Sequence, residues 1–246
     1  MVPFNGNQPR GTYKAGKISA WITAIIVAVI AGYILLGHSP LLDVEELEVY
    51  GLHHLRLEEV EDRLGFKIGD PLPLGLGESQ RKLEELSWVK TADIDRSWSG
   101  RITVDISEYK PLALALTEPE RWALVADDGT VLTHGLIAPL DLPRLSGVHA
   151  AGSPGTYLSA DSSALLSLLV LMPPELGDKF FSLRRDSSGE IHGTLRTNQE
   201  VIFGDDKRLG AKIISLSAML DYLEAEKRTD DYIDVSYPEK PIVTNE

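Results

Sequence analysis

Four short stretches of the sequence carry residue types that could do chemistry. Adjacent histidines can bind a metal ion, paired carboxylates can act as acid and base, and a glycine-rich loop can cradle a phosphate. These stretches are His53-His54, Asp127-Asp128, Asp205-Asp206 and the loop Gly75–Ser79. Each of them also has a plain structural interpretation.

The plain interpretation accounts for every one of these stretches. Neighbouring residues of a strand point to opposite faces, so His53 and His54 cannot share a metal ion and are predicted to be surface residues. The first aspartate pair precedes a glycine in a turn, and Asp205 or Asp206 is predicted to cap a helix. The loop "GLGES" lacks the lysine of a phosphate-binding loop. The sequence therefore predicts no catalytic residue, no cofactor and no metal site.

The composition of the chain excludes further classes of function. The chain has 246 residues, no cysteine and a formal net charge of −13. A strongly acidic chain lacks the basic patches that bind nucleic acid, and without cysteine there are no disulfides or thiolate metal sites. Arg10, Lys14 and Lys17 precede the first acidic residue, Asp43, so the start of the chain is basic and the remainder acidic.

Residues 18–37 are predicted to be a transmembrane helix. This run, "ISAWITAIIVAVIAGYILLG", contains no charged residue, and a helix of this length spans roughly 30 Å, the thickness of the bilayer interior. Two alternatives are a buried core helix and a cleaved signal peptide, but the run is apolar on every face and "GHSPLL" is a poor cleavage site. The basic tail 1–17 is then predicted to be cytoplasmic, with about 200 residues outside.

Residues 42–115 predict a small domain with the order β-α-α-β-β. Leucine and valine recur at helical spacing in "LEEVEDRLG" and alternate with polar residues in "LEVYG". Ile102, Val104 and Ile106 alternate cleanly in "RITVDIS", which is typical of a strand with one buried face. The turn "SWSG" joins this strand to the preceding one, "VKTADID".

This domain resembles a POTRA domain, and its second half resembles the bacterial cell division family FtsQ/DivIB. In that family a Trp-Val pair opens a strand, Arg-x-Trp marks the turn and Glu-x-x-Pro closes the last strand. The corresponding residues are Trp88 and Val89, Arg96 and Trp98, and Glu108 and Pro111. Ser99 departs from the family, which has proline after the tryptophan.

Residues 116–238 predict a second domain with a mixed or antiparallel sheet, so the fold class is α+β. "WALVADDGTVL" reads as a hairpin, and "LPRLSG" resembles a connector of the same family. A helix capped by Ser159 and stopped by Pro173 and Pro174 follows, and after it come three strands and a long helix. The leucine stripe of that long helix fits either an amphipathic helix on a sheet or a short coiled coil. Residues 239–246 are predicted to be a tail.

The resemblance implies a non-enzymatic scaffold of the division complex in the cytoplasmic membrane at the septum. It implies FtsB and FtsL as direct partners and the septal peptidoglycan synthesis machinery as the downstream client. The alternatives are a POTRA-containing envelope assembly or secretion component and a membrane-anchored envelope hydrolase. The first would continue into a barrel of many alternating strands, and too little chain follows for that.

The partner site is predicted at the last strand, Tyr232–Tyr237, placed at a sheet edge where unpaired backbone groups accept a strand. Tyr232, Asp234 and Ser236 are predicted to face outward, and Tyr237 to lie at the frayed end. Pairing is expected to fade at the prolines that follow. The resemblance implies the same region, because the family binds FtsB through its C-terminal strand. The alternative is a closing strand that binds no partner.

Overall fold

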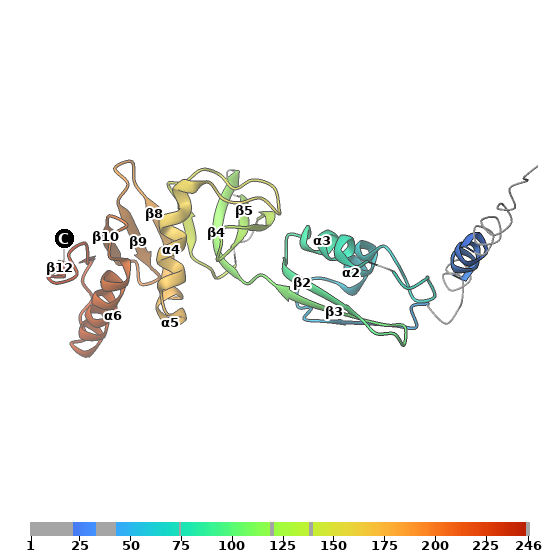
Figure 1. The fold of residues 1–246 in the computed structure, drawn as a ribbon. Coiled ribbons are helices and arrows are strands. Elements are labelled where there is room, and N and C mark those ends of the chain that lie inside the picture. Colours follow the sequence, from blue (N-terminus) through green and yellow to red (C-terminus); the bar gives the residue numbers. More distant parts are fainter. Residues whose placement is uncertain (1–21, 33–42, 74, 119–120, 138–139, 245–246) are drawn as a thin grey trace, which may run out of the picture.

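The first feature of the fold is a helix near the N-terminus. The computed structural model describes residues 22–32, 43–73, 75–118, 121–137 and 140–244 (Figure 1). Residues 22–32 are helical, whereas the tail 1–17 and the remainder of the predicted span 18–37 lie outside the described residues. Within the described ranges, no helix combines the length and apolar character needed to cross a bilayer.

Residues 46–108 form a small domain in the predicted order. Its sheet has the strand order β1-β3-β2, in which β1 is parallel and β2 antiparallel to the central β3. The elements are β1 (Glu46–Tyr50), α2 (Leu57–Leu64), α3 (Gly77–Glu84), β2 (Val89–Arg96) and β3 (Arg101–Glu108). The β-α-α-β-β prediction is confirmed.

The alternating side chains of β3 make the core of this domain. Ile102, Val104 and Ile106 are buried against leucine and valine side chains of the two helices. Helix α2 ends at Gly65, whose backbone is left-handed, a conformation that glycine adopts without strain. Leu57, expected on the buried face of α2, is exposed instead.

The remaining residues form a second domain around one mixed sheet. Its strand order is β12-β11-β10-β9-β8-β7-β4-β5-β6, with parallel pairs at β4-β7, β7-β8 and β10-β11. The strands are β4 (Pro111–Glu118), β5 (Arg121–Ala126), β6 (Val131–Leu136), β7 (Arg144–Ser146), β8 (Phe180–Arg185), β9 (Ile191–Leu195), β10 (Glu200–Gly204), β11 (Tyr232–Asp234) and β12 (Ile242–Thr244). The helices are α4 (Ser163–Leu171), α5 (Pro174–Gly177) and α6 (Leu209–Ala225), with a 3-10 turn at Ala160–Ser162.

Helices α4 and α6 lie on the same side of this sheet (Figure 1). The buried stripe of α6 includes Leu209, Ile213, Leu216 and Leu223, which pack in the same core as the strands beneath. The amphipathic helix on a sheet is therefore the correct one of the two alternatives.

Two boundaries differ from the predictions. The stretch "LPRLSG", predicted as a connector, contains β7, which lies in the middle of the sheet between β4 and β8. The domain boundary predicted after residue 115 falls inside β4, which pairs with β5 and β7 of the second sheet. Its apolar run "PLALAL" is buried on both faces of the second sheet, because Ala113 and Ala115 lie in the large core and Leu114 lies in a smaller cluster.

The caps of two helices also differ. Arg208, in a left-handed conformation, precedes α6, and neither aspartate caps it. Asp205 instead accepts a hydrogen bond from the Lys212 ammonium at 2.6 Å, and that lysine side chain is only 2% exposed. Ser159 precedes the 3-10 turn without a capping side-chain bond. Helix α4 ends at Leu171, just before the two prolines as predicted, and Pro174 then begins α5.

The two domains meet where β3 leads into β4. Ser87 donates a hydrogen bond to the carbonyl of Leu132 at 2.8 Å, and the Tyr109 hydroxyl donates to Asp128 at 2.9 Å. Lys90 forms an ion pair with Asp127 at 3.1 Å. The predicted turn aspartates, Asp127-Asp128, therefore also join the domains.

Candidate partner-binding edge

The C-terminal edge of the large sheet is a hairpin made of β11 and β12. Strand β11 runs parallel to β10, with Ile233 opposite Val201 in the buried core. The Val235 amide donates to the Ile202 carbonyl at 2.9 Å and extends this attachment by one residue. Ile233 and Val235 both face the core, as the alternation predicted.

A tight turn after β11 reverses the chain. Oδ1 of Asp234 accepts hydrogen bonds from the Ser236 amide at 2.8 Å and the Ser236 hydroxyl at 2.6 Å. The Lys240 amide then donates to the Tyr237 carbonyl at 2.9 Å, with Pro238 at the turn position that proline favours. Gly204 permits this path, because a Cβ there would lie 2.9 Å from the Cβ of Ser236.

The returning chain pairs with β11, so the predicted edge was placed one strand too far inward. Strand β12 is antiparallel to β11, with Val243 opposite Ile233. It occupies residues predicted to be a tail, and β11 ends at Asp234 rather than Tyr237. In the part of the chain that the structure describes, no strand lies on the outer side of β12, so β12 is the open edge.

The four predicted site residues lie in two places, strand β11 and the turn that follows it. Tyr232 and Asp234 lie within β11, between two paired strands. Ser236 is engaged in the turn through Asp234, whereas Tyr237 is 75% exposed on that turn. Tyr237 is therefore the predicted residue that lies free at the surface beside β12.

An apolar groove of about 490 Å³ adjoins the same turn. Helix α6 and the segment that leads into β12 form its two walls. The apolar lining residues are Ala211, Ile214, Ala218, Met219, Tyr222, Pro238 and Pro241. Ile214 and Tyr222 are exposed along the groove. Ile242 of β12 is exposed too, but it is paired opposite Asp234 and faces away from the core that contains Ile233 and Val243.

An ion pair fixes the turn against the helix. The Arg208 guanidinium donates to the Glu239 carboxylate, and this hydrogen bond holds the pKa of Glu239 below its ordinary value. Arg208 immediately precedes α6, so the pair joins the start of the helix to the turn before β12. Sequence reasoning missed this edge; the β-branched run "IVT" after a proline was the available signal.

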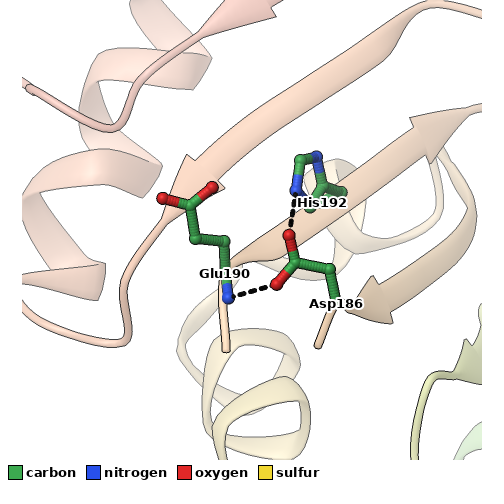
Figure 2. A group of neighbouring side chains, drawn as sticks. All are labelled: Asp186, Glu190 and His192. Carbon is green, nitrogen blue, oxygen red and sulfur yellow. Dashed lines mark hydrogen bonds and ion pairs between the residues drawn. The ribbon is translucent and has the colours of Figure 1, made fainter. Parts of the chain in front are cut away.

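A second cluster lies at the turn between β8 and β9. Figure 2 shows Asp186, Glu190 and His192 with Asp186 between the other two. Asp186 accepts hydrogen bonds from the Ser188 hydroxyl at 2.7 Å and the Glu190 amide at 2.9 Å. The bond from Ser188 is the largest cause that lowers the pKa of Asp186 to about 2. His192 lies 3.5 Å from Asp186 and 3.3 Å from Glu200, so this group closes a hairpin turn.

A third cluster contains two residues of the family motif, Trp88 and Glu108, together with the adjacent histidines His53 and His54. Glu108 accepts hydrogen bonds from the backbone amides of His53, His54 and Leu55 at 2.8, 2.8 and 3.1 Å. The His54 ring stacks on Trp88 with ring centroids 4.3 Å apart. Trp88 in turn packs against the Leu132 cluster of the second domain. His54, predicted as a plain surface residue, thus has a structural role at the domain junction.

Comparison with known proteins agrees with these two domains. A model of the POTRA domain, FtsQ-type, matches residues 42–109, and a model of the FtsQ/DivIB C-terminal domain matches residues 113–236. The chain belongs to the FtsQ/DivIB family of cell division proteins. Because members of this family are non-enzymatic parts of the division machinery, the prediction that the chain is not an enzyme is confirmed.

Individual FtsQ proteins resemble the chain over nearly its whole length. The cell division protein FtsQ of Mycolicibacterium smegmatis is 27% identical over 236 residues, which cover 96% of this chain and 67% of that protein. FtsQ of Streptomyces bingchenggensis is 27% identical over 234 residues, 91% of this chain and 85% of that protein. The solved extracytoplasmic domain of DivIB from Geobacillus stearothermophilus matches 48% of this chain and 97% of that domain at 14% identity. Its TM-score is 0.35, a likeness too loose to carry an argument.

Proposed function

We propose that this FtsQ/DivIB protein is a scaffold that captures a partner strand at the open edge of β12. FtsB and FtsL are the direct partners, and septal peptidoglycan synthesis is the process they control together. Residues 18–37 anchor the chain in the cytoplasmic membrane, with both domains on the outer side at the septum. The uncharged run and the basic flank before it support this topology.

The observation that carries the proposal is that, among the residues the structure describes, no strand pairs with the outer side of β12. An edge strand presents amide and carbonyl groups that an incoming strand can bond, and apolar side chains beside the edge add affinity. Here the edge adjoins the apolar groove of α6 and the exposed ring of Tyr237. The partner site therefore moves outward from the predicted Tyr232, Asp234 and Ser236 to β12, and Tyr237 remains at its rim.

Proline substitutions test strand addition because they remove single amide donors. Along an antiparallel edge strand the amides point alternately toward the neighbour and toward solvent. Ile242→Pro and Val243→Pro therefore remove amides of opposite direction, and the wild type is compared with both. A hydrogen bond contributes about 0.5–1.5 kcal/mol net, so the outward variant should weaken partner binding about 2- to 10-fold.

The readout is affinity for FtsB from the same organism, measured with the full chain in lipid nanodiscs, beside the unfolding temperature. One variant should lose affinity at unchanged stability, and the other should lose stability. Equal affinity for all three proteins would remove β12 as the site. Tyr237→Ala tests the rim separately, whereas Ser236→Pro would break the bond to Asp234 and so test the turn.

Topology is tested by reporter enzymes fused after residue 246. A reporter that folds only outside the cytoplasm should be active there, because the basic residues Arg10, Lys14 and Lys17 keep the N-terminus inside. Activity of a cytoplasm-only reporter at the same position would overturn the membrane arrangement and leave the family assignment intact.

A further inference from the structure

One end of the POTRA domain carries a strongly exposed tryptophan. Trp98, in the turn between β2 and β3, is 86% exposed, the highest value among the large apolar side chains of the described residues. Ile68, in the loop after α2, is 63% exposed. Neither side chain belongs to a core cluster, so burial within the domain does not account for them.

Backbone hydrogen bonds join both loops to the start of the domain. The Val44 amide donates to the Asp70 carbonyl, and the Gly69 amide donates to the Val44 carbonyl, each at 2.8 Å. The Glu45 amide donates to the Gly100 carbonyl at 2.9 Å. Residues 43–45, 67–70 and 96–100 thus form one surface, the POTRA tip, at the end of the domain away from β4 (Figure 1).

The length of the connecting chain keeps this tip close to a membrane, provided that residues 18–37 are anchored as proposed above. Asp43 follows Gly37 by six residue steps. Six residues span at most about 20 Å when fully extended, whatever their conformation. The POTRA tip therefore stays within reach of the lipid headgroups at all times.

The side chains of the tip suit that layer. Tryptophan favours the headgroup region, where its apolar ring and its N–H donor are both accommodated. The Arg96 guanidinium lies 5.9 Å from the Trp98 ring and Lys67 is exposed beside Ile68, so cations flank both apolar side chains. Asp43, Glu45 and Asp70 lie on the same surface, so apolar contact rather than net positive charge must supply the attraction.

We propose that the POTRA tip docks on the lipid headgroup layer, with Trp98 and Ile68 at the interface. Docking would fix the tilt of the domain relative to the membrane. The β12 edge lies at the far end of the molecule from this tip (Figure 1). A docked tip would therefore hold the partner-binding edge at a set height above the bilayer.

Single cysteines test this directly, because the natural chain has none. The full chain in lipid vesicles is labelled with an environment-sensitive fluorophore at Ser99→Cys, and emission is compared with and without lipids that carry a headgroup-level quencher. Ser188→Cys in the β8–β9 turn is the matched exposed control, and Ala28→Cys reports the anchor with a quencher in the acyl chain. We expect quenching at position 99 to exceed that at position 188 severalfold.

Three outcomes separate this inference from the proposed function. Quenching at position 28 but not at position 99 overturns tip docking and keeps the anchor. No quenching at position 28 overturns the anchor and the docking together. Adding Trp98→Ser should reduce the quenching at position 99, whereas Trp98→Phe should retain most of it. Unchanged quenching in the serine variant would show tethering alone and would overturn the role of Trp98.

Discussion

The two ends of the molecule present different kinds of surface. The POTRA tip offers side chains on loops whose backbone is already bonded within the domain, through the amides of Val44, Glu45 and Gly69. The β12 edge offers backbone groups with no strand beside them among the described residues. Side chains of this kind suit a fluid lipid surface, whereas a backbone edge demands a partner strand in register. If both proposals hold, one chain binds a membrane and a protein through separate surfaces.

The largest expected effect comes from breaking the core behind the POTRA tip. Ile102→Ala and Ile106→Ala each remove buried methyl groups and should cost about 2–5 kcal/mol. Urea unfolding of the full chain should show an early transition of the small domain. The exposed Thr91→Ala on β2 is the control.

The affinity of the same two isoleucine variants for FtsB is a second measurement that tests whether the two ends are independent. The β12 edge belongs to a separate core, so both isoleucine variants should keep their affinity for FtsB. Loss of affinity in step with the loss of stability would show that the two ends are not independent. Unchanged unfolding in both variants would instead refute the assigned buried face of β3.

A smaller effect is expected at the junction between the two ends. Glu108 is 4% exposed, and burial alone would raise its pKa. The backbone amides of His53, Leu55 and His54 outweigh burial and hold the pKa of Glu108 below its ordinary value of 4.5. Glu108→Gln weakens these charged hydrogen bonds, and unfolding should become easier by about 1–3 kcal/mol.

The pH dependence at Glu108 has a definite sign. Its folded-state pKa is depressed, so its stabilising contribution is present above about pH 4.5 and is lost as pH falls through the folded value. Urea midpoints of the wild type and Glu108→Gln should therefore differ at pH 7 and converge on acidification. A constant difference down to acid pH would contradict this assignment.

The smallest effect is expected at the β8–β9 turn, which belongs to neither end. The pKa of Asp186 falls from 3.8 to about 2, so its contribution is present above about pH 4 and is lost between there and pH 2. Asp186→Asn should lower the urea midpoint slightly at neutral pH and leave partner and lipid binding unchanged. Native-state hydrogen exchange of the turn amides, including that of Ser188, locates the change. Equal exchange in both proteins would refute the role of Asp186.

Long alternating elements were predictable from sequence, and short strands were not. Ile102, Val104 and Ile106 alternate over an eight-residue strand, which shows its buried face without reference to the rest of the fold. Strands β7 and β12 have three residues each, too few to display alternation. Their strand conformation is imposed by neighbouring strands that lie far away in the sequence.

The candidate site was also predictable in part, where its residues alternate, and unpredictable where distant residues meet. Alternation correctly placed Ile233 and Val235 in the core, but Pro238 and Pro241 were taken as the end of pairing. In the structure Pro238 lies within the turn and pairing resumes after Pro241. The contact between Glu108 and the His54 backbone joins residues 54 positions apart, a distance that no local pattern records.

Cysteine crosslinking between β12 and its partner tests strand addition most directly. Thr244→Cys in the otherwise cysteine-free chain is paired with a scan of single cysteines along the C-terminal segment of FtsB. In a strand, successive side chains point to opposite faces, so disulfide trapping should peak at every second partner residue and fade with distance from one register. Peaks spaced three to four residues apart would indicate a docked helix, and no trapping would indicate another site; either result would contradict strand capture at β12.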